Sequence, residues 1–122
     1  MAKRILIVDD SDSIRNVVGI ALRGEGYEVI EAKDGVDGLS KLDGSKFHLI
    51  ISDVNMPNMD GISMVKELKA QSEYRFTPVI MLTTETEDGK KQQGKEAGVK
   101  AWMVKPFQPQ QMIDAVSKLI LA

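Results

Sequence analysis

The fold is decided by the stretch Ile50-Ile51-Ser52-Asp53-Val54-Asn55-Met56-Pro57-Asn58-Met59-Asp60-Gly61. Its first part is a short, bounded apolar run with β-branched residues, which is typical of a strand buried on both faces of a sheet. The Asn, Pro and Gly residues after it predict a turn. Asp53 is therefore expected at the carboxyl end of a strand, the edge at which open α/β sheets bind ligands. An Asp that only caps a turn would give the same local pattern, so the choice depends on the other strands.

Strand and helix patterns alternate five times along the chain. This alternation predicts an α/β fold with a single doubly wound (βα)5 domain, in which helices cover both faces of a five-stranded parallel sheet. The second strand mixes polar and apolar residues and is expected at an edge of the sheet. Asp12 or Ser13 is expected to cap the first helix, and Pro109 suits the first turn of the last. Strands are expected at 5–8, 28–32, 48–51, 79–82 and 101–104, and the apolar positions of the helices lie within 14–22, 36–42, 62–68 and 113–120.

The segment from Glu85 to Ala97 must supply the helix between the fourth and fifth strands, although it has no large apolar residue. Gly89 and Gly94 lie inside it, and each interior glycine costs about 0.5–1 kcal/mol relative to alanine. We therefore expect this helix to be the least stable one. Its lysines are interpreted as a solvated face, with a binding patch as the alternative: they are Lys90, Lys91 and Lys95.

The length of 122 residues is common for one domain with one hydrophobic core. A formal net charge of -2 gives no electrostatic reason to expect nucleic acid or an anionic membrane as a partner. The absence of cysteine excludes disulfides and thiolate metal sites. The apolar run near the N-terminus, Ile5 to Val8, is too short for a signal peptide or a membrane span. We expect a soluble, cytoplasmic protein.

Polar side chains follow four of the predicted strands. They are Asp9 and Asp10, Asp53, Thr83, and Lys105. Because the carboxyl ends of parallel strands share one edge of a sheet, these side chains are expected to converge in one pocket. Two carboxylates about 4 Å apart repel by roughly 4 kcal/mol at an effective dielectric of 20. Three together need raised pKa values or a cation, and oxygen ligands without His or Cys favour a hard ion, most simply Mg²⁺.

A magnesium site of this composition predicts phosphoryl transfer, because protein-bound Mg²⁺ usually binds a phosphate together with one or two carboxylates. Asp53 is the candidate nucleophile, since carboxylates form aspartyl-phosphates in several enzymes. Lys105 and the metal would neutralise charge on the transferring group, and Thr83 offers a hydroxyl to a phosphoryl oxygen.

The pattern Asp9-Asp10, Asp53, Thr83 and Lys105-Pro106 resembles the receiver domain of bacterial two-component response regulators. The resemblance covers essentially the whole chain, so it implies a receiver domain over residues 1–122 without an output domain. Met56-Pro57-Asn58-Met59-Asp60-Gly61 and Val104-Lys105-Pro106-Phe107 are most similar to single-domain chemotaxis receivers of the CheY type. The flavodoxin-like strand order 2-1-3-4-5 is taken over from that family and is not deduced from the residues. The family also implies a cis bond between Lys105 and Pro106.

The resemblance assigns a role to each site residue. Asp53 would accept a phosphoryl group from a histidine kinase, and Thr83 and Lys105 would contact that group. The Mg²⁺ ligands would be Asp10, Asp53 and the backbone carbonyl of Asn55, with Asp9 contributing through water. Asn55, together with Glu85, would flank the approach of a hydrolytic water and tune dephosphorylation.

Trp102 stands three residues before Lys105, at the position of the family's aromatic switch residue, where Tyr, Phe or His is more usual. Packing in the core is the competing interpretation, since indole is often partly buried. The bulk of Trp also argues against a full inward swing of the ring. Gln108 is a second departure, because a capping Thr or Ser is common there.

The resemblance implies a signalling protein and not an enzyme with a substrate of its own. Its only reactions would be self-phosphorylation from the kinase phosphohistidine and autodephosphorylation. The implied partners are a CheA-like histidine kinase and a flagellar motor switch protein, which would contact the face from about Lys90 to Ile120. A phosphatase is a further candidate partner. We expect a monomer, and the net charge argues against contact with nucleic acid or membranes.

Four other functions are weighed against this one. A stand-alone receiver in a non-chemotaxis phosphorelay differs only in its partners. A haloacid-dehalogenase-type phosphatase also uses an aspartyl nucleophile with Mg²⁺, Thr and Lys, but it places a second Asp where this chain has Asn55. A flavodoxin-type cofactor module needs Ser, Thr and Gly in its first loop, whereas Asp9-Asp10-Ser11-Asp12 would repel phosphate. A degenerate receiver would act as a plain interaction domain, but every phosphorylation residue is present here.

Overall fold

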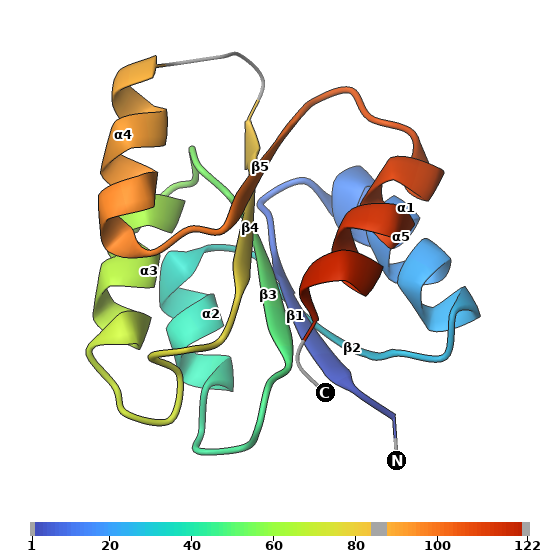
Figure 1. Cartoon of the computed structure of the whole chain (residues 1–122), viewed down its shortest axis with the longest axis horizontal. Helices are drawn as coiled ribbons and strands as arrows, with labels where there is room; N and C mark the ends of the chain where they lie inside the picture. The colour runs from blue at the N-terminus through green and yellow to red at the C-terminus, as the bar shows by residue number, and fades with distance from the viewer. Residues whose placement is uncertain (1, 84–87, 121–122) are drawn as a thin grey trace.

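The computed structural model describes residues 2–83 and 88–120, with the backbone alone for 88–91. Strands and helices alternate five times, as predicted (Figure 1). The strands are β1 (Arg4–Val8), β2 (Glu28–Ala32), β3 (Leu49–Asp53), β4 (Val79–Thr83) and β5 (Ala101–Val104). The helices are α1 (Asp12–Gly24), α2 (Gly35–Lys41), α3 (Gly61–Lys69), α4 (Asp88–Ala97) and α5 (Pro109–Leu119).

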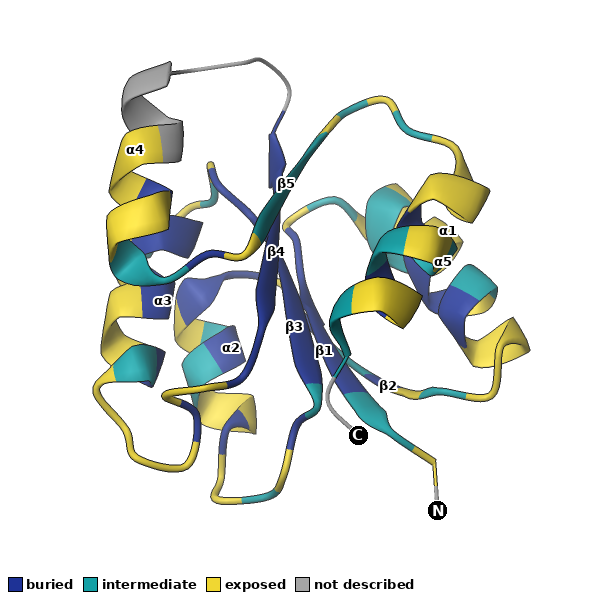
Figure 2. Cartoon of the chain, in the orientation of Figure 1, coloured by how far each residue is buried: buried dark blue, intermediate teal, exposed yellow. Residues whose placement is uncertain are grey.

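The sheet is parallel throughout, with the strand order β2-β1-β3-β4-β5. This order confirms the one implied by the family resemblance, and β2 lies at an edge as its mixed sequence predicts. Helices α1 and α5 cover one face of the sheet, while α2, α3 and α4 cover the other (Figure 1). Because β1, β3 and β4 are covered on both faces, they are almost entirely buried (Figure 2).

Two hydrophobic cores lie on the two faces of the sheet. Alternate residues of one strand enter different cores: in β1, Leu6 and Val8 pack under α2 and α3, whereas Ile5 and Ile7 pack under α1 and α5. This explains the continuous apolar runs in the sequence, since a strand covered on one face only would alternate with polar residues. Each fully buried aliphatic side chain contributes about 1.5–3 kcal/mol relative to an exposed one. The three central strands therefore form a rigid base for whatever follows them.

The N-cap of α1 is Ser11, so the prediction of Asp12 or Ser13 was wrong. The Ser11 hydroxyl accepts a hydrogen bond from the Ile14 backbone N–H at 3.3 Å. Asp12 begins the helix and forms an ion pair with Arg15. A cap side chain accepts from the N–H two or three residues ahead, and among the five consecutive polar residues 9–13 it is Ser11 that occupies this place.

The third strand begins at Leu49 instead of the predicted His48. His48 still joins the sheet margin, because its Nδ1 accepts a hydrogen bond from the Arg4 backbone N–H at 2.9 Å. A histidine that accepts this bond is a satisfied polar residue at the start of the strand.

Helix α4 occupies the place predicted for it, but Gly94 has a packing role that its sequence pattern does not predict. A Cβ atom on Gly94 would lie only 2.3 Å from Cζ2 of Trp102. The glycine therefore lets α4 approach the indole, which is half-buried and packs against the core under α2 and α3. Lys95 is exposed, whereas the side chains of Lys90 and Lys91 are outside the described part. None of the described helices is long and apolar enough to cross a lipid bilayer.

Candidate functional site

Three carboxylates meet at the carboxyl edge of the sheet. Asp9, Asp10 and Asp53 each offer an oxygen atom, and these atoms all lie within 4.8 Å of one another. They come together because β1 and β3 are neighbours, so that Asp9 and Asp10 leave the sheet beside Asp53. Asp9 is fully buried and Asp53 is 8% exposed, while Asp10 faces solvent. The cluster thus has a dry inner side and one ligand open to water.

Lys105 supplies a positive charge to the cluster. Its Nζ lies 3.0 Å from Oδ2 of Asp9 and 3.3 Å from Oδ2 of Asp53. The residue is brought there by the backbone, since its N–H donates to the carbonyl oxygen of Thr83 at 2.7 Å. The bond from Lys105 to Pro106 is cis, as the resemblance implies. One ammonium group faces three carboxylates, so negative charge is in excess.

The electrostatics of the site follow from this excess and from burial. Burial raises the pKa of Asp53, the charge of Asp9 raises it further, and Lys105 only partly opposes both effects. Burial lowers the pKa of Lys105, but the hydrogen bond and charge of Asp9, together with the charge of Asp53, outweigh it and raise that pKa. Lys105 therefore stays protonated at neutral pH, and the site favours an additional cation.

The nucleophile candidate is held in a fixed orientation. Oδ1 of Asp53 accepts a hydrogen bond from the Val54 backbone N–H at 2.8 Å, which leaves Oδ2 facing Lys105. Helix α3 begins close to this strand end, because the Gly61 N–H donates to the carbonyl oxygen of Val54 at 2.8 Å. A Cβ atom on Gly61 would lie 2.1 Å from the carbonyl oxygen of Asp53. Glycine is therefore needed where the turn after the strand meets the helix.

Two backbone amides orient the site, and sequence reasoning missed both. The Val54 N–H fixes Asp53, and the Ser11 N–H donates to Oδ1 of Asp9 at 2.9 Å. Arg15 adds a side-chain hydrogen bond to the carbonyl oxygen of Asp9. No sequence signal could have identified the amides, since every residue except proline has a backbone N–H.

The other described residues of the predicted site lie on β4, in the loop after β3 and on β5. Thr83 is buried at the end of β4, the strand that separates β3 from β5. Asn55 is exposed in the loop after β3. Within the described part of the chain, no donor bonds to its carbonyl oxygen. Trp102 packs against Gly94, and Glu85 lies outside the described residues.

The donor set fits a magnesium ion. Octahedral Mg²⁺ takes oxygen ligands at about 2.0–2.1 Å, which places neighbouring ligand atoms about 3–4 Å apart. The carboxylate oxygens of Asp9, Asp10 and Asp53 all lie within 4.8 Å of one another, which is slightly wider than this spacing. The cluster contains oxygen donors only, and the exposed side at Asp10 leaves room for the waters that Mg²⁺ retains. The arrangement can bind a hard divalent cation beside a carboxylate oxygen and an ammonium group.

Comparisons with known proteins show the family to which the chain is similar. The sequence model of the response regulator receiver domain matches residues 5–117. The chain is 40% identical over 121 residues to the alkaline phosphatase synthesis transcriptional regulatory protein PhoP of Bacillus subtilis. That match covers 99% of this chain and 49% of PhoP, so the chain spans about half the length of this relative.

Two solved structures extend the comparison. The chemotaxis response regulator CheY4 of Vibrio cholerae is 47% identical, with a TM-score of 0.92 over 98% of this chain and 99% of CheY4. The receiver domain of the sensor histidine kinase PA1611 from Pseudomonas aeruginosa PAO1 is 27% identical, with a TM-score of 0.89 over 98% of each chain. The PA1611 structure has a magnesium ion coordinated in its active site cleft.

Proposed function

This chain belongs to the response regulator receiver family, and from that premise we propose that a histidine kinase phosphorylates it on Asp53. Receiver domains of this family are the phosphorylation-switched signalling parts of two-component systems. The observation that carries the assignment of Asp53 is its place in the cluster. It lies at the end of a buried strand, with Oδ2 facing Lys105 at 3.3 Å and two further carboxylates within 4.8 Å.

In the proposed transfer, Oδ2 of Asp53 attacks the phosphorus atom of the kinase phosphohistidine. An O–P bond forms, the P–N bond breaks, and the imidazole leaves with its electron pair and takes up a proton. The Val54 N–H holds the Asp53 carboxylate in this orientation by donating a hydrogen bond to Oδ1. The protonated Lys105 is placed to neutralise charge on the phosphoryl oxygens, and the hydroxyl of Thr83 is proposed to donate to one of them.

The metal is proposed to be Mg²⁺. Asp10, Asp53 and the backbone carbonyl of Asn55 would hold it, with Asp9 acting through water. When bound, Mg²⁺ supplies positive charge that stabilises the oxygens of the transferring group. This proposal explains why three carboxylates are gathered around a single ammonium group.

The switch is proposed to act through Trp102 and the surface formed by α4, β5 and α5. Trp102 already packs against α4 at Gly94, so a movement of its indole would also displace that helix. Asn55 and Glu85 are proposed to tune dephosphorylation. The output surface lies within residues 90–120, as the sequence resemblance implies.

Chemotaxis is the pathway that we propose for this receiver. The 47% identity to the chemotaxis regulator CheY4 supports a CheA-like kinase and a flagellar motor switch protein as partners. The 40% identity to the transcriptional regulator PhoP supports the alternative, a receiver in another two-component circuit.

The receiver chemistry is tested by intact mass spectrometry after incubation with acetyl phosphate and Mg²⁺. We expect a single phosphoryl adduct on the wild-type chain and none on Asp53→Asn or after chelation of the metal. Absence of the adduct, under conditions that label a known receiver, would overturn the assignment of Asp53.

The pathway is tested separately by measuring how a flagellar motor switch protein binds the phosphorylated chain and the Asp53→Asn variant. Binding that requires phosphorylation supports chemotaxis. Equal binding of the phosphorylated chain and the variant, or no binding of either, would refute the chemotaxis proposal without affecting the receiver chemistry.

A further inference from the structure

Phe76 is the most exposed large apolar side chain among the described residues, at 81%. It lies in the segment between α3 and β4, at the amino edge of the sheet. Burying such a side chain would stabilise the fold, so its exposure forgoes that stabilisation. Strand β4 is five residues long, which places this edge about 17 Å from the carboxyl edge, where the carboxylate cluster lies. Nothing at the phosphorylation site accounts for Phe76.

The segment that carries Phe76 is firmly braced. The Tyr74 hydroxyl donates to the carbonyl oxygen of Ser45 at 2.9 Å and accepts from the Gly44 N–H at 3.0 Å. The Thr77 N–H donates to the carbonyl oxygen of Tyr74 at 3.1 Å. Tyr74 and Thr77 are buried on either side of Phe76. The ring is therefore exposed because the backbone turns it outward, and not because the loop is loosely packed.

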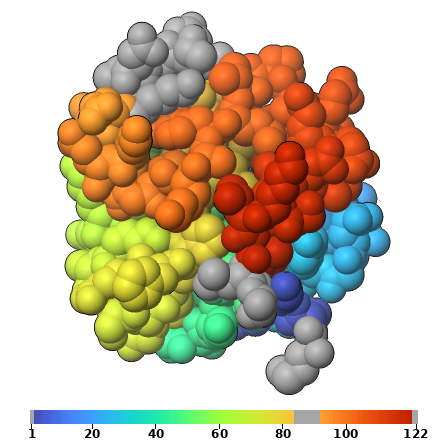
Figure 3. Space-filling view, in the orientation of Figure 1, coloured from blue at the N-terminus to red at the C-terminus, as the bar shows by residue number. Residues whose placement is uncertain are grey.

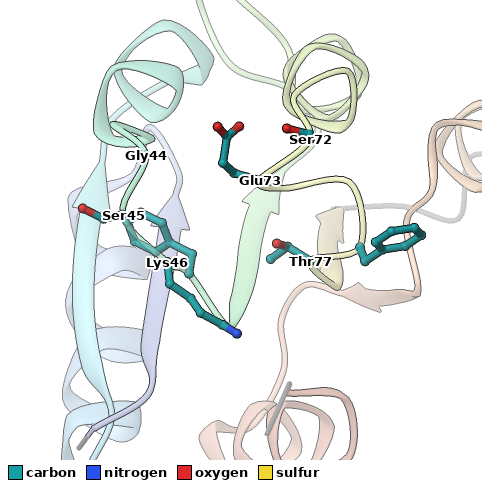
Figure 4. Close-up of a pocket in the computed structure, with 8 residues that line it drawn as sticks. Gly44, Ser45, Lys46, Ser72, Glu73 and Thr77 are labelled. Carbon is teal, nitrogen blue, oxygen red and sulfur yellow. The ribbon is translucent and has the colours of Figure 1, made fainter.

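Phe76 lines two hollows. One has a volume of about 380 Å³, and Figure 4 shows Lys46, Glu73 and Thr77 around it. The other has a volume of about 310 Å³ and runs toward the segment between α4 and β5. The residues that line the second hollow are Lys69, Arg75, Phe76, Ala97, Gly98 and Lys100. A volume of this size accommodates a side chain or a small ligand.

The second hollow is positively charged, and one of its cations, the Lys69 ammonium group, also donates a hydrogen bond to the carbonyl oxygen of Thr77. Lys69, Arg75 and Lys100 line it, and no acidic residue does. Within residues 2–83 and 92–120, none of the three forms a salt bridge. Burial lowers the pKa of Lys69, and the charge of Lys100 lowers it further. The formal net charge of the whole chain is -2, so this hollow is a local exception.

We propose that Phe76 and these three cations form a docking site for an acidic protein segment that carries one aromatic or aliphatic side chain. The site goes beyond the proposed phosphorylation switch and lies at the opposite edge of the sheet. Aromatic side chains, Phe among them, are enriched at protein interfaces, where anchors fill pockets of the partner. The surrounding positive charge selects an acidic partner and orients it. The net negative charge of the chain opposes an extended polyanion or an anionic bilayer, so a short acidic segment fits better.

The test is an NMR titration of the ¹⁵N-labelled chain with the peptide Glu-Asp-Glu-Phe-Glu-Asp-Glu. We expect saturable shifts in residues 69–77 and 97–100, and binding weaker by about tenfold when Phe76 is replaced by Ser. The matched control is Ile20→Ser, which removes another exposed apolar side chain on α1 (71%) and should leave the affinity unchanged. A peptide with Gln and Asn in place of its acids should bind about tenfold more weakly. Equal affinity for both peptides, shifts elsewhere, or no saturation would overturn the proposal.

A charge reversal provides an independent test. The exposed pair Arg75→Glu and Lys100→Glu should lose the acidic peptide and gain binding to Lys-Lys-Lys-Phe-Lys-Lys-Lys. An unchanged circular dichroism spectrum would show that the double variant folds. Retention of the acidic peptide by the double variant overturns the site. Flotation with phosphatidylserine vesicles, or self-association that Phe76→Ser abolishes, would overturn the choice of an acidic segment in favour of a membrane or a second copy.

Discussion

Asp53 lies in an environment that disfavours its own charge. Burial and the neighbouring Asp9 raise its pKa, and Lys105 compensates only in part. Removing this charge should therefore stabilise the metal-free protein, even though it abolishes the proposed phosphorylation. A residue can be central to chemistry and still be a stability cost.

We predict that Asp53→Asn raises the free energy of unfolding at neutral pH, without metal, by on the order of 1 kcal/mol. A raised pKa means that the folded state keeps its proton after the unfolded state has lost it. The destabilisation caused by charged Asp53 is therefore absent below the unfolded-state pKa of about 3.9 and complete above the folded-state pKa. Urea denaturation at several pH values measures it. Asp114→Asn on the exposed face of α5 makes the same charge change and serves as the control. Equal stabilisation by both variants would contradict the prediction.

His48 has the opposite relation to pH. Burial lowers its pKa, the charge of Lys46 lowers it further, and the Arg4 N–H donates to Nδ1 of the neutral ring. Between the unfolded-state pKa of about 6.5 and the lower folded-state pKa, His48 is protonated in the unfolded state and neutral in the folded state. We predict that stability falls as pH drops through this window. In His48→Asn, whose side-chain oxygen can still accept from Arg4, that part of the pH dependence should vanish, as urea unfolding at pH 5–7 would show. An unchanged slope in the variant would refute the assignment to His48.

At the scale of single elements, the helix between β4 and β5 shows what helix propensity cannot predict. The sequence places a helix there because the fold requires one, and interior glycines mark it as weak. Gly94 is nevertheless buried against Trp102, with no room for a Cβ atom. The rule that alanine stabilises a helix relative to glycine is therefore expected to fail at this position.

We predict that Gly94→Ala destabilises the protein by about 1–3 kcal/mol, the usual cost of overpacking. Trp102 is the only tryptophan, so its fluorescence spectrum should change with the displacement of the indole. The matched control is Gly24→Ala at the end of α1, where a Cβ atom meets nothing within 4 Å. That substitution should be neutral or stabilising by up to about 1 kcal/mol and should leave the fluorescence unchanged. Stabilisation by Gly94→Ala, measured by urea unfolding, would refute the packing argument.

The boundaries of elements divide into predictable and unpredictable ones for physical reasons. The strand ends beside Asp9, Asp53 and Thr83 were predictable to within two residues, because burying a charged or polar side chain costs free energy unless it is paired. The cap of α1 was not, since the five consecutive polar residues 9–13 offer several candidates and only backbone geometry selects Ser11. The convergence of the site followed from parallel topology alone. The amides that orient it, and the close approach of α3 at Gly61, depend on distances that no pattern contains.

At the scale of the whole molecule, the candidate metal site is built on the strands that hold the protein together. Asp9 and Asp10 follow β1 and Asp53 ends β3, two adjacent buried strands that contribute to both hydrophobic cores. A ligand of these residues binds only the folded state, because the unfolded chain does not gather them. Its binding energy should therefore appear as stability of the whole domain and not of one loop.

We predict that Mg²⁺ at about 100 times its dissociation constant stabilises the protein by about 2.7 kcal/mol. If unfolding is two-state, Trp102 fluorescence and far-UV circular dichroism should report the same shift of the transition, although the indole lies on β5 away from the cluster. Asp10→Asn removes a carboxylate from the exposed side of the cluster and should reduce the shift, whereas Asp114→Asn should retain it. Sodium chloride at equal ionic strength separates binding from screening, because screening acts on every exposed charge. A shift that sodium reproduces, or that Asp10→Asn retains in full, would place the ion elsewhere and remove the metal from the proposed mechanism.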